Sequence, residues 1–497
     1  MKPFRFYMFL LPFLFQGFVY SQVSDFKLSD YKLPRLDRKS LETNFNITGN
    51  NDYYKRSTDL YSSKNTSDQY SGSFSINYNH YVSNERIQRY SDVYGYFNSG
   101  FYVYKLDEVI QSKNNSVTPI FNLSRVNRYY FSNIRFIESD IYVHGLYQRY
   151  YNYFYNSSFT LPISDLRQEH TGMLQLPLKY GVGRIEQVQD ARHALYLFDH
   201  LSRIDRITKN ENGDEVIEFA SLISTLKNKR FFDSRIRRME EIESVDSFLL
   251  AKNYVLKHDA RYFTTLGDYW DYGNSPVRYS GSRISFAILP GVFYTHFDEN
   301  NISYFPDENF SRQYSVYAFL VNAGIEYTKE KPINLYWQNS IGVYGFVGTV
   351  EGKINYLSEN DKQTLRVPNI QAGFTHTIGF YPNTRTDASF GYEVRYIKLF
   401  DKYNVDKKIA GLDGMGVNTA AHIAVNYYIS PKFRLNLSGD LNYIWENSKS
   451  SSVLTFESIQ QSSLFISNIS NFRIARYGFK VNSISSSFQL ALIYSIF

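Results

Sequence analysis

Residues 433–446 read FRLNLSGDLNYIWE, a stretch in which apolar and polar side chains alternate. Successive side chains of a β-strand point to opposite faces, so a period of two predicts a strand with one apolar and one polar face. The apolar side chains are Phe433, Leu435, Leu437, Leu441, Tyr443 and Trp445. The polar side chains between them are Arg434, Asn436, Ser438, Asp440, Asn442 and Glu446.

The same alternation recurs at both ends of the chain. It appears in residues 317–327, 390–396 and 419–429, and near the start in residues 74–82. This recurrence predicts that both ends of the protein are β-structure.

Strand length and connection length decide between two β architectures, a secreted sandwich and a membrane barrel. The alternating segments run for about 12–18 residues, longer than the usual strand of a soluble protein and long enough to cross an outer membrane. Tight turns at 329–332, 381–384 and 430–432 separate long polar connections at 298–312, 351–364, 401–416 and 448–471. Short turns on one side and long loops on the other favour the barrel.

The same alternation allows the strands to be counted. After Arg278 we count eight, starting near Tyr279, Gln313, Ile333, Arg366, Thr386, Gly416, Lys432 and Tyr477. Before Tyr180 we count six, starting near Asn44, Asp68, Arg86, Thr118, Asp140 and Gly172. The predicted fold is an all-β transmembrane barrel of about 14 antiparallel strands, an even number as bacterial single-chain barrels have.

The first residues have the pattern of a secretory signal peptide. Lys2 and Arg5 precede an apolar run over residues 6–15, and Val19-Tyr20-Ser21 offers a cleavage site. We therefore expect a signal peptide over residues 1–21 and a periplasmic N-terminal segment over residues 22–43.

Composition excludes several classes of protein. The chain has no cysteine, which excludes disulfides, thiolate metal sites and cysteine nucleophiles. A mean hydropathy of -0.39 does not fit a helical membrane protein, and 43% hydrophobic residues do not fit disorder. The formal charge of +6 over 497 residues is too small to indicate nucleic-acid binding.

The end of the chain carries a resemblance. The closing segment FQLALIYSIF, residues 488–497, alternates and ends in phenylalanine. Together with the signal peptide and the cysteine-free strands, it resembles the outer-membrane β-barrel proteins of Gram-negative bacteria; no characterised subfamily is recognised. The resemblance implies a location in the outer membrane, contact with its lipid, and recognition by the barrel-assembly machinery during biogenesis. The apolar positions of this segment are out of phase with Phe497, which departs from the usual terminal signal.

Between the two β regions the period changes to that of helices. Val188, Ala191, Leu195 and Phe198 recur at steps of three and four, a second helix is expected from Asp214, and a third from about Ser234. We therefore divide the chain into a first barrel part over residues 44–181, an α-helical insertion over 182–278, and a second barrel part over 279–497. The strand count places the insertion in the periplasm or, as a plug, in the lumen.

A basic cluster within the insertion is a candidate site for a periplasmic protein partner. Adjacent phenylalanines inside a basic cluster indicate a contact surface for an acidic partner or for phosphate-bearing lipid or glycan. The alternative is a solvated helix start. The candidate partner-binding residues are Lys227, Lys229, Arg230, Phe231, Phe232 and Arg235.

The polar faces of the later strands predict the lining of a lumen. At about 14 strands a barrel is wide enough for water unless it is plugged. The candidate lumen-lining residues are Asp387, Glu393, Arg395, His422, Asn426, Arg434, Asn436, Asp440 and Asn442. The alternative is that these charges pair with one another and only stabilise the barrel.

The function expected from this sequence is a channel or transporter for small solutes, with the helical insertion as a gate or docking module. The alternative is a non-transporting assembly or adhesion component, whose barrel anchors the helical insertion for a partner. None of the nine histidines lies in a lipase, zincin or comparable motif, and His193 and His200 are not at the four-residue spacing of a helical metal pair. We expect no cofactor, no metal and no catalysis, unless loops bring catalytic residues together.

Overall fold

A computed structural model of the chain describes most of the two β regions and the helices between them. The residues described are 26–32, 35–58, 61–155, 163–208, 212–228, 238–272, 277–302, 310–356, 361–400, 414–430, 433–448, 453–457, 471–475 and 480–494. The predicted signal peptide and the last three residues lie outside them.

Along the chain, one group of strands precedes the four helices and a second group follows them. The first group comprises β1 (Leu36–Thr58), β2 (Tyr61–Ser83), β3 (Ile87–Leu106), β4 (Val109–Tyr130), β5 (Arg135–Phe154), β6 (Ile163–Gln175) and β7 (Leu178–Gln187). The second comprises β8 (Tyr279–Ile302), β9 (Phe310–Pro332), β10 (Trp337–Tyr356), β11 (Asp361–Phe380), β12 (Thr386–Leu399), β13 (Gly414–Ser430), β14 (Phe433–Ser448) and β17 (Lys480–Tyr494). A hairpin of β15 (Val453–Glu457) and β16 (Asn471–Ala475) lies in the connection expected to be a loop.

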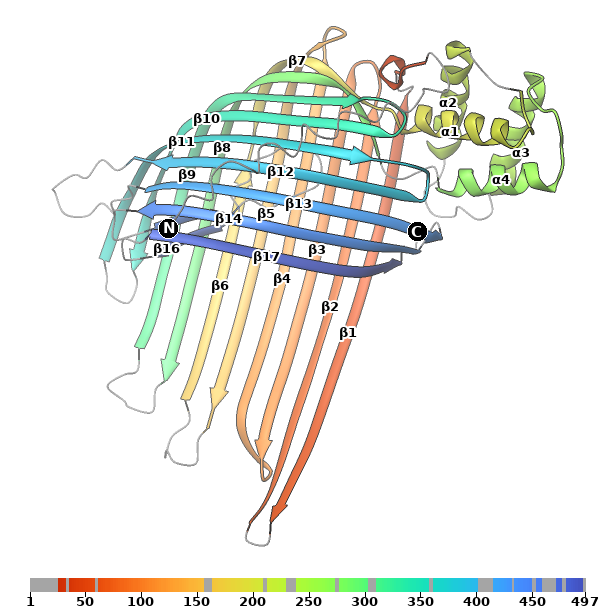
Figure 1. The fold of residues 1–497 in the computed structure, drawn as a ribbon. Helices are drawn as coiled ribbons and strands as arrows, with labels where there is room; N and C mark the ends of the chain where they lie inside the picture. Colours follow the sequence, from red (N-terminus) through yellow and green to blue (C-terminus); the bar gives the residue numbers. More distant parts are fainter. Residues whose placement is uncertain are drawn as a thin grey trace, which may run out of the picture.

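One antiparallel sheet contains 15 of these strands, and it curls into a barrel (Figure 1). Neighbouring strands pair in chain order from β1 to β17. The one exception in this sheet is β7, which pairs with β5 and β8, the same two strands that pair with β6. Since β6 and β7 keep the same register with both neighbours, they are one crossing interrupted at Leu176 and Pro177. Proline has no amide hydrogen to donate to the ladder. The predicted antiparallel barrel, of about 14 crossings, is confirmed.

The outer face of this sheet exposes apolar side chains from one strand to the next. Phe45, Phe74 and Phe97, for example, are paired in register across β1, β2 and β3, and all three are exposed. A soluble monomer rarely exposes so large a continuous apolar surface. Further exposed side chains on the same face include Ile47, Phe121, Ile284, Phe286, Tyr317, Phe319, Ile325, Val347, Ile423 and Leu441.

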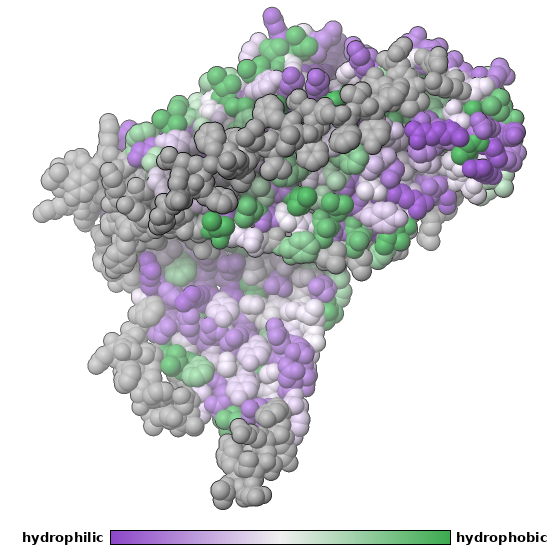
Figure 2. All heavy atoms as spheres, viewed as in Figure 1, coloured by the Kyte–Doolittle hydropathy of each residue, from purple (hydrophilic) through white to green (hydrophobic). Residues whose placement is uncertain are grey.

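The helices are α1 (Gln189–Arg203), α2 (Gly213–Asn228), α3 (Arg238–Ala251) and α4 (Ala260–Tyr272). They lie beyond the strand ends at the short-turn end of the barrel (Figure 1), and the side seen in Figure 2 is mostly purple to white with some green patches. The fourth helix was not foreseen. Of the helices in the described part of the chain, none is long and apolar enough to cross a membrane.

The helices share one core with two distant parts of the chain. Phe26, Leu28 and Tyr31, which precede β1, are buried in it, and so is Leu335 from the turn between β9 and β10. β1 itself begins at Leu36, ahead of the boundary predicted at residue 44. The segment before β1 therefore packs as part of the helical domain.

Candidate functional site

The candidate site is the inner face of the barrel, opposite the exposed apolar side chains. Strand register places every predicted lumen-lining residue on this face, because each pairs with another member or with an inward neighbour. Asn426 accepts a hydrogen bond from Asn436 at 2.9 Å and donates one to Asp387 at 2.8 Å. Glu393 and Arg395 form an ion pair, and His422 lies opposite Asp440.

Two glycines on the inner face leave room for aromatic side chains of a neighbouring strand. A Cβ atom on Gly391 would lie 2.1 Å from the imidazole of His422, and one on Gly373 would lie 2.2 Å from the ring of Tyr344. Each ring therefore lies flat over a glycine, which covers the backbone that the glycine exposes. His422 is a packed wall residue in this arrangement.

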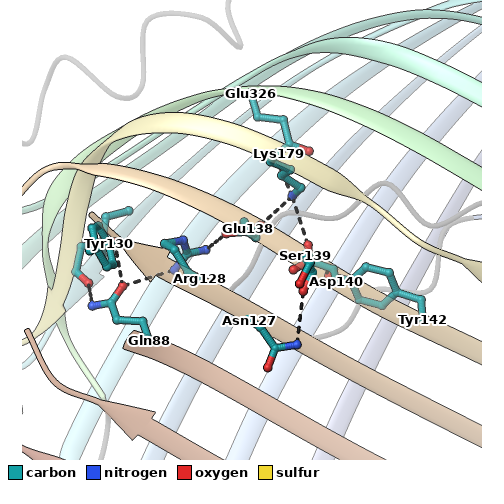
Figure 3. A network of polar contacts seen from close by, with 11 residues as sticks. Gln88, Asn127, Arg128, Tyr130, Glu138, Ser139, Asp140, Tyr142, Lys179 and Glu326 are labelled. Carbon is teal, nitrogen blue, oxygen red and sulfur yellow. Dashed lines mark hydrogen bonds and ion pairs between the residues drawn. The ribbon is translucent and has the colours of Figure 1, made fainter. Parts of the chain in front are cut away.

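A buried network of charges crosses the inner face toward the helical end (Figure 3). Arg128, Glu138 and Lys179 are neighbours in one row of the sheet, on β4, β5 and β7. Lys179 Nζ lies 3.1 Å from Glu138, 3.6 Å from Asp140 and 2.9 Å from Glu326. Arg128 forms an ion pair with Glu138 and donates to Gln88 at 3.2 Å. The network ties β3, β4, β5, β7 and β9 together.

Small residues allow Lys179 to reach Glu326 across the intervening strand β8. The row that contains Lys179 continues through Ala287 on β8 and Gly324 on β9. With no bulky side chain at these positions, the lysine chain extends across β8 to reach Glu326 on β9. The side chain of Lys179 is only 5% exposed, and its charge is tolerated there because it is paired.

The inner face of β6 and β8–β12 also carries an apolar zone that the sequence analysis missed. Leu320, Val350 and Val367 are paired in one row across β9, β10 and β11, and none is more than 1% exposed. The residues of this zone are Met173, Phe293, Ala318, Leu320, Val350, Val367 and Leu399. The available signal was that residues 316–321 are apolar at even and odd positions alike, which indicates a strand that is apolar on both faces.

The predicted partner-binding cluster is described only at its first residue. Lys227 was expected on an exposed surface, but it is 5% exposed within the helical domain. Its ammonium lies 2.6 Å from His193 Nδ1 and over the ring of Trp270, on α1 and α4. Lys227 therefore does not belong to a docking surface. Lys229, Arg230, Phe231, Phe232 and Arg235 lie outside the described residues.

Arg278 fixes the helical domain to the rim of the barrel. Its guanidinium donates to the carbonyl oxygens of Leu335 at 2.5 Å, Asn334 at 2.9 Å and Trp337 at 2.7 Å, and to Gln338 Oε1 at 3.2 Å. The side chain is 1% exposed. Burial and the nearby positive charge of Arg192 lower the pKa of Arg278 to about 10.

Further contacts reach the neighbouring short turns. Tyr196 donates to the carbonyl oxygen of Tyr381 at 2.7 Å, and burial raises the pKa of Tyr196 to about 12. Arg385 forms an ion pair with Asp268, and Tyr272 donates to the carbonyl oxygen of Ile429 at 3.1 Å. The domain is thus held on the rim at three separate turns.

Within the described ranges, no group of three or more histidine, aspartate or glutamate side chains is placed to hold a metal ion.

No family model matches the chain, and no curated protein matches it. Among solved structures, it is similar to the TodX deltaS2S3 mutant monoaromatic hydrocarbon channel. The two are 8% identical with a TM-score of 0.31, over 84% of this chain and 87% of that chain. A similarity this weak says nothing about the substrate.

Proposed function

We propose that this protein is an outer-membrane channel for small solutes. The observation that carries the proposal is the contrast between the two faces of one continuous sheet. The outer face exposes apolar side chains on strand after strand, while the inner face carries amides, hydroxyls and charges beside one buried apolar zone. Lipid is the solvent that such an outer face requires, and an inner face of this composition suits water and polar solutes.

The mechanism would be diffusion along the inner face. A barrel of about 14 strands is wider than the roughly eight-stranded barrels that fill themselves with side chains. Several charges of the inner face are paired, as in the network around Lys179. Selectivity would come from pore width and from neutral hydrogen-bonding groups more than from a net field.

The orientation follows from the turns. In outer-membrane barrels the short turns lie in the periplasm and the long loops outside. The helical domain is bound to the short turns, so it would lie in the periplasm. Because buried contacts hold it at three turns, it would serve as a fixed docking module on the rim.

Planar-bilayer recording tests the channel directly. Discrete current steps from the purified protein are expected, and the absence of current at any voltage would contradict the proposal. The chain is free of cysteine, so Asp268→Cys with Arg385→Cys allows the helical domain to be cross-linked to the rim without side reactions. Unchanged conductance after cross-linking is expected of a fixed module, and lost conductance would identify a moving gate.

A second candidate is a non-conducting anchor that presents the helical domain to a periplasmic protein. The secure attachment of the domain to the rim favours it. A photo-cross-linker at Phe231 or Phe232 would capture the partner, and a protein that gives such a product without conducting would be the anchor.

A further inference from the structure

A hollow of about 130 Å³ lies on the inner face of β2–β5, toward the ends of the strands that are farthest from the helical domain. These ends form the lowest part of Figure 1. The hollow is lined by four adjacent strands, which contribute residues 69–71, 100–102 and 114–116 and Tyr150.

The hollow exists because small residues lie side by side in one row. Gly100 on β3 is paired with Ser71 on β2 and with Ser116 on β4. A glycine between two serines leaves a depression in the wall, and Tyr150, the partner of Ser116 on β5, closes one end. The next row, with Gln69, Tyr102 and Asn114, forms a taller side.

The chemistry of this lining is neutral and rich in hydrogen-bonding groups. Amides and hydroxyls both donate and accept, and the phenol rings offer flat apolar faces. Tyr150 is 38% exposed, so a ligand can reach it. The charged residue opposite it, Arg167, is already bonded to Glu299 at 2.8 Å. The part of the molecule around these strand ends is coloured mostly purple to white (Figure 2).

Inward tyrosines continue from the hollow along β3. Because side chains two positions apart share a face, Tyr90, Tyr94 and Tyr96 point inward with Tyr102. The rings of Tyr94 and Tyr96 are stacked with 6.4 Å between their centroids and 8° between their planes. Tyr90 donates to Asn79 on β2 at 2.8 Å. The hollow thus lies at one end of a row of inward tyrosines on β3, and the amide of Asn79 lies beside the other end of this row.

We propose that this hollow binds a neutral saccharide. A sugar ring has hydroxyls that match amides and hydroxyls around its edge, and an apolar face that matches a phenol ring. Tyr102 and Tyr150 would contact the ring face, and Gln69 and Asn114 would bind its hydroxyls. An ionic ligand finds no counter-charge in the lining, and a hydrocarbon would leave the amides unpaired, which is costly. The site goes beyond the proposed function, since binding here does not require conduction.

Binding is tested on the intact barrel, purified in a detergent without a sugar headgroup. Maltotriose, chitotriose and mannotriose serve as probes, and saturation-transfer NMR gives the affinity for each. At least one trisaccharide is expected to bind. Binding of none of them overturns the proposal, as does binding of hexanoate or toluene at this hollow in their place. Conductance is recorded separately, so a failed channel and a failed saccharide site are told apart.

Strand alternation supplies matched variants. Ser116→Leu fills the hollow, whereas Val117→Leu adds the same side chain to the opposite face of β4, at a position outside the lining. Tyr150→Ala removes an aromatic contact, and Tyr151→Ala is its counterpart on the outer side of β5. Affinity should fall about tenfold or more for the first member of each pair, and stay unchanged for the second. Equal effects within the pairs overturn the assignment; retained heat-modifiable migration on gels shows that each variant is folded.

Discussion

Lys179 in the barrel wall and Arg278 at the rim are both buried cations, but their charges are compensated differently. Lys179 lies among the carboxylates of Glu138, Asp140 and Glu326. Arg278 donates only to uncharged oxygens, three of them backbone carbonyls of the turn between β9 and β10. The wall thus depends on balanced charges from several strands, whereas the rim depends on a turn held in one shape.

Replacing the wall cation should have the largest effect. Lys179→Met leaves the buried carboxylates of Glu138 and Asp140 and the partly exposed carboxylate of Glu326 with only Arg128 and Arg283 as cations nearby. The free energy of unfolding should fall by about 3–5 kcal/mol, the usual result of breaking a buried ion pair from one side. Urea unfolding in lipid vesicles measures it. Lys353→Met, at an exposed position, is the control, and an equal loss in both variants would show that the network contributes nothing.

Removal of Arg278 at the rim should lower the free energy of unfolding less than removal of Lys179, because the oxygens that lose their donor are neutral. Arg278→Ala should destabilise the attachment of the helical domain by about 2–4 kcal/mol, as several buried carbonyls lose a donor. Hydrogen exchange should rise in α1 and in the turn at Asn334 while the strands stay protected. Arg261→Ala, an exposed change in α4, serves as the control. Loss of protection throughout the barrel would contradict a local role.

A third variant tests whether Lys179 needs the space above β8. Ala287→Leu places a larger side chain on the inner face, in the row through which Lys179 reaches Glu326. Overpacking of this kind costs about 1–3 kcal/mol. Ile288→Leu, at the next residue and on the outer face, should leave the free energy of unfolding unchanged. If both variants behave alike, the lysine does not depend on the small residue.

The smallest effect should be a pH dependence of the helical domain. Burial lowers the pKa of His200, with Arg203 acting in the same direction and Asp199 against it. The unfolded chain then takes up a proton at a higher pH than the folded domain does. Stability should therefore decrease as the pH falls through the unfolded pKa of about 6.5 and on to the lower folded value.

His200→Phe tests this, since it keeps a ring to stack on Tyr269, whose centroid lies 4.1 Å away. Thermal unfolding of the domain, followed from pH 8 to pH 5, should be less dependent on pH in the variant. An unchanged slope would assign the pH dependence to another group.

The sequence predicted the barrel well because its signal is local. Alternation within each strand and the lengths of the connections are visible without knowing which strands pair. The fourth helix, residues 260–272, escaped because its run of aromatic residues reads as readily as a strand. The break at Pro177 escaped because it interrupts the ladder without altering the alternation on either side.

The inner-face network was not predictable in the same way. Arg128, Glu138 and Lys179 become neighbours only through the register of three strands, and a shift of one residue would separate them. Lys227 was misplaced for a similar reason: its buried partners His193 and Trp270 come from other helices. A cluster of charged residues in a sequence segment therefore does not show which of its side chains are exposed.

The shared core of the helices sets an order of events during biogenesis. It needs Phe26 and Leu28 from before the first strand and Leu335 from after the ninth, so the helices cannot complete their packing until the hairpin of β9 and β10 exists. A chain arrested before that hairpin would display an open apolar core to chaperones and proteases. Completed packing of the helical domain would thus report that the strands up to β10 have formed.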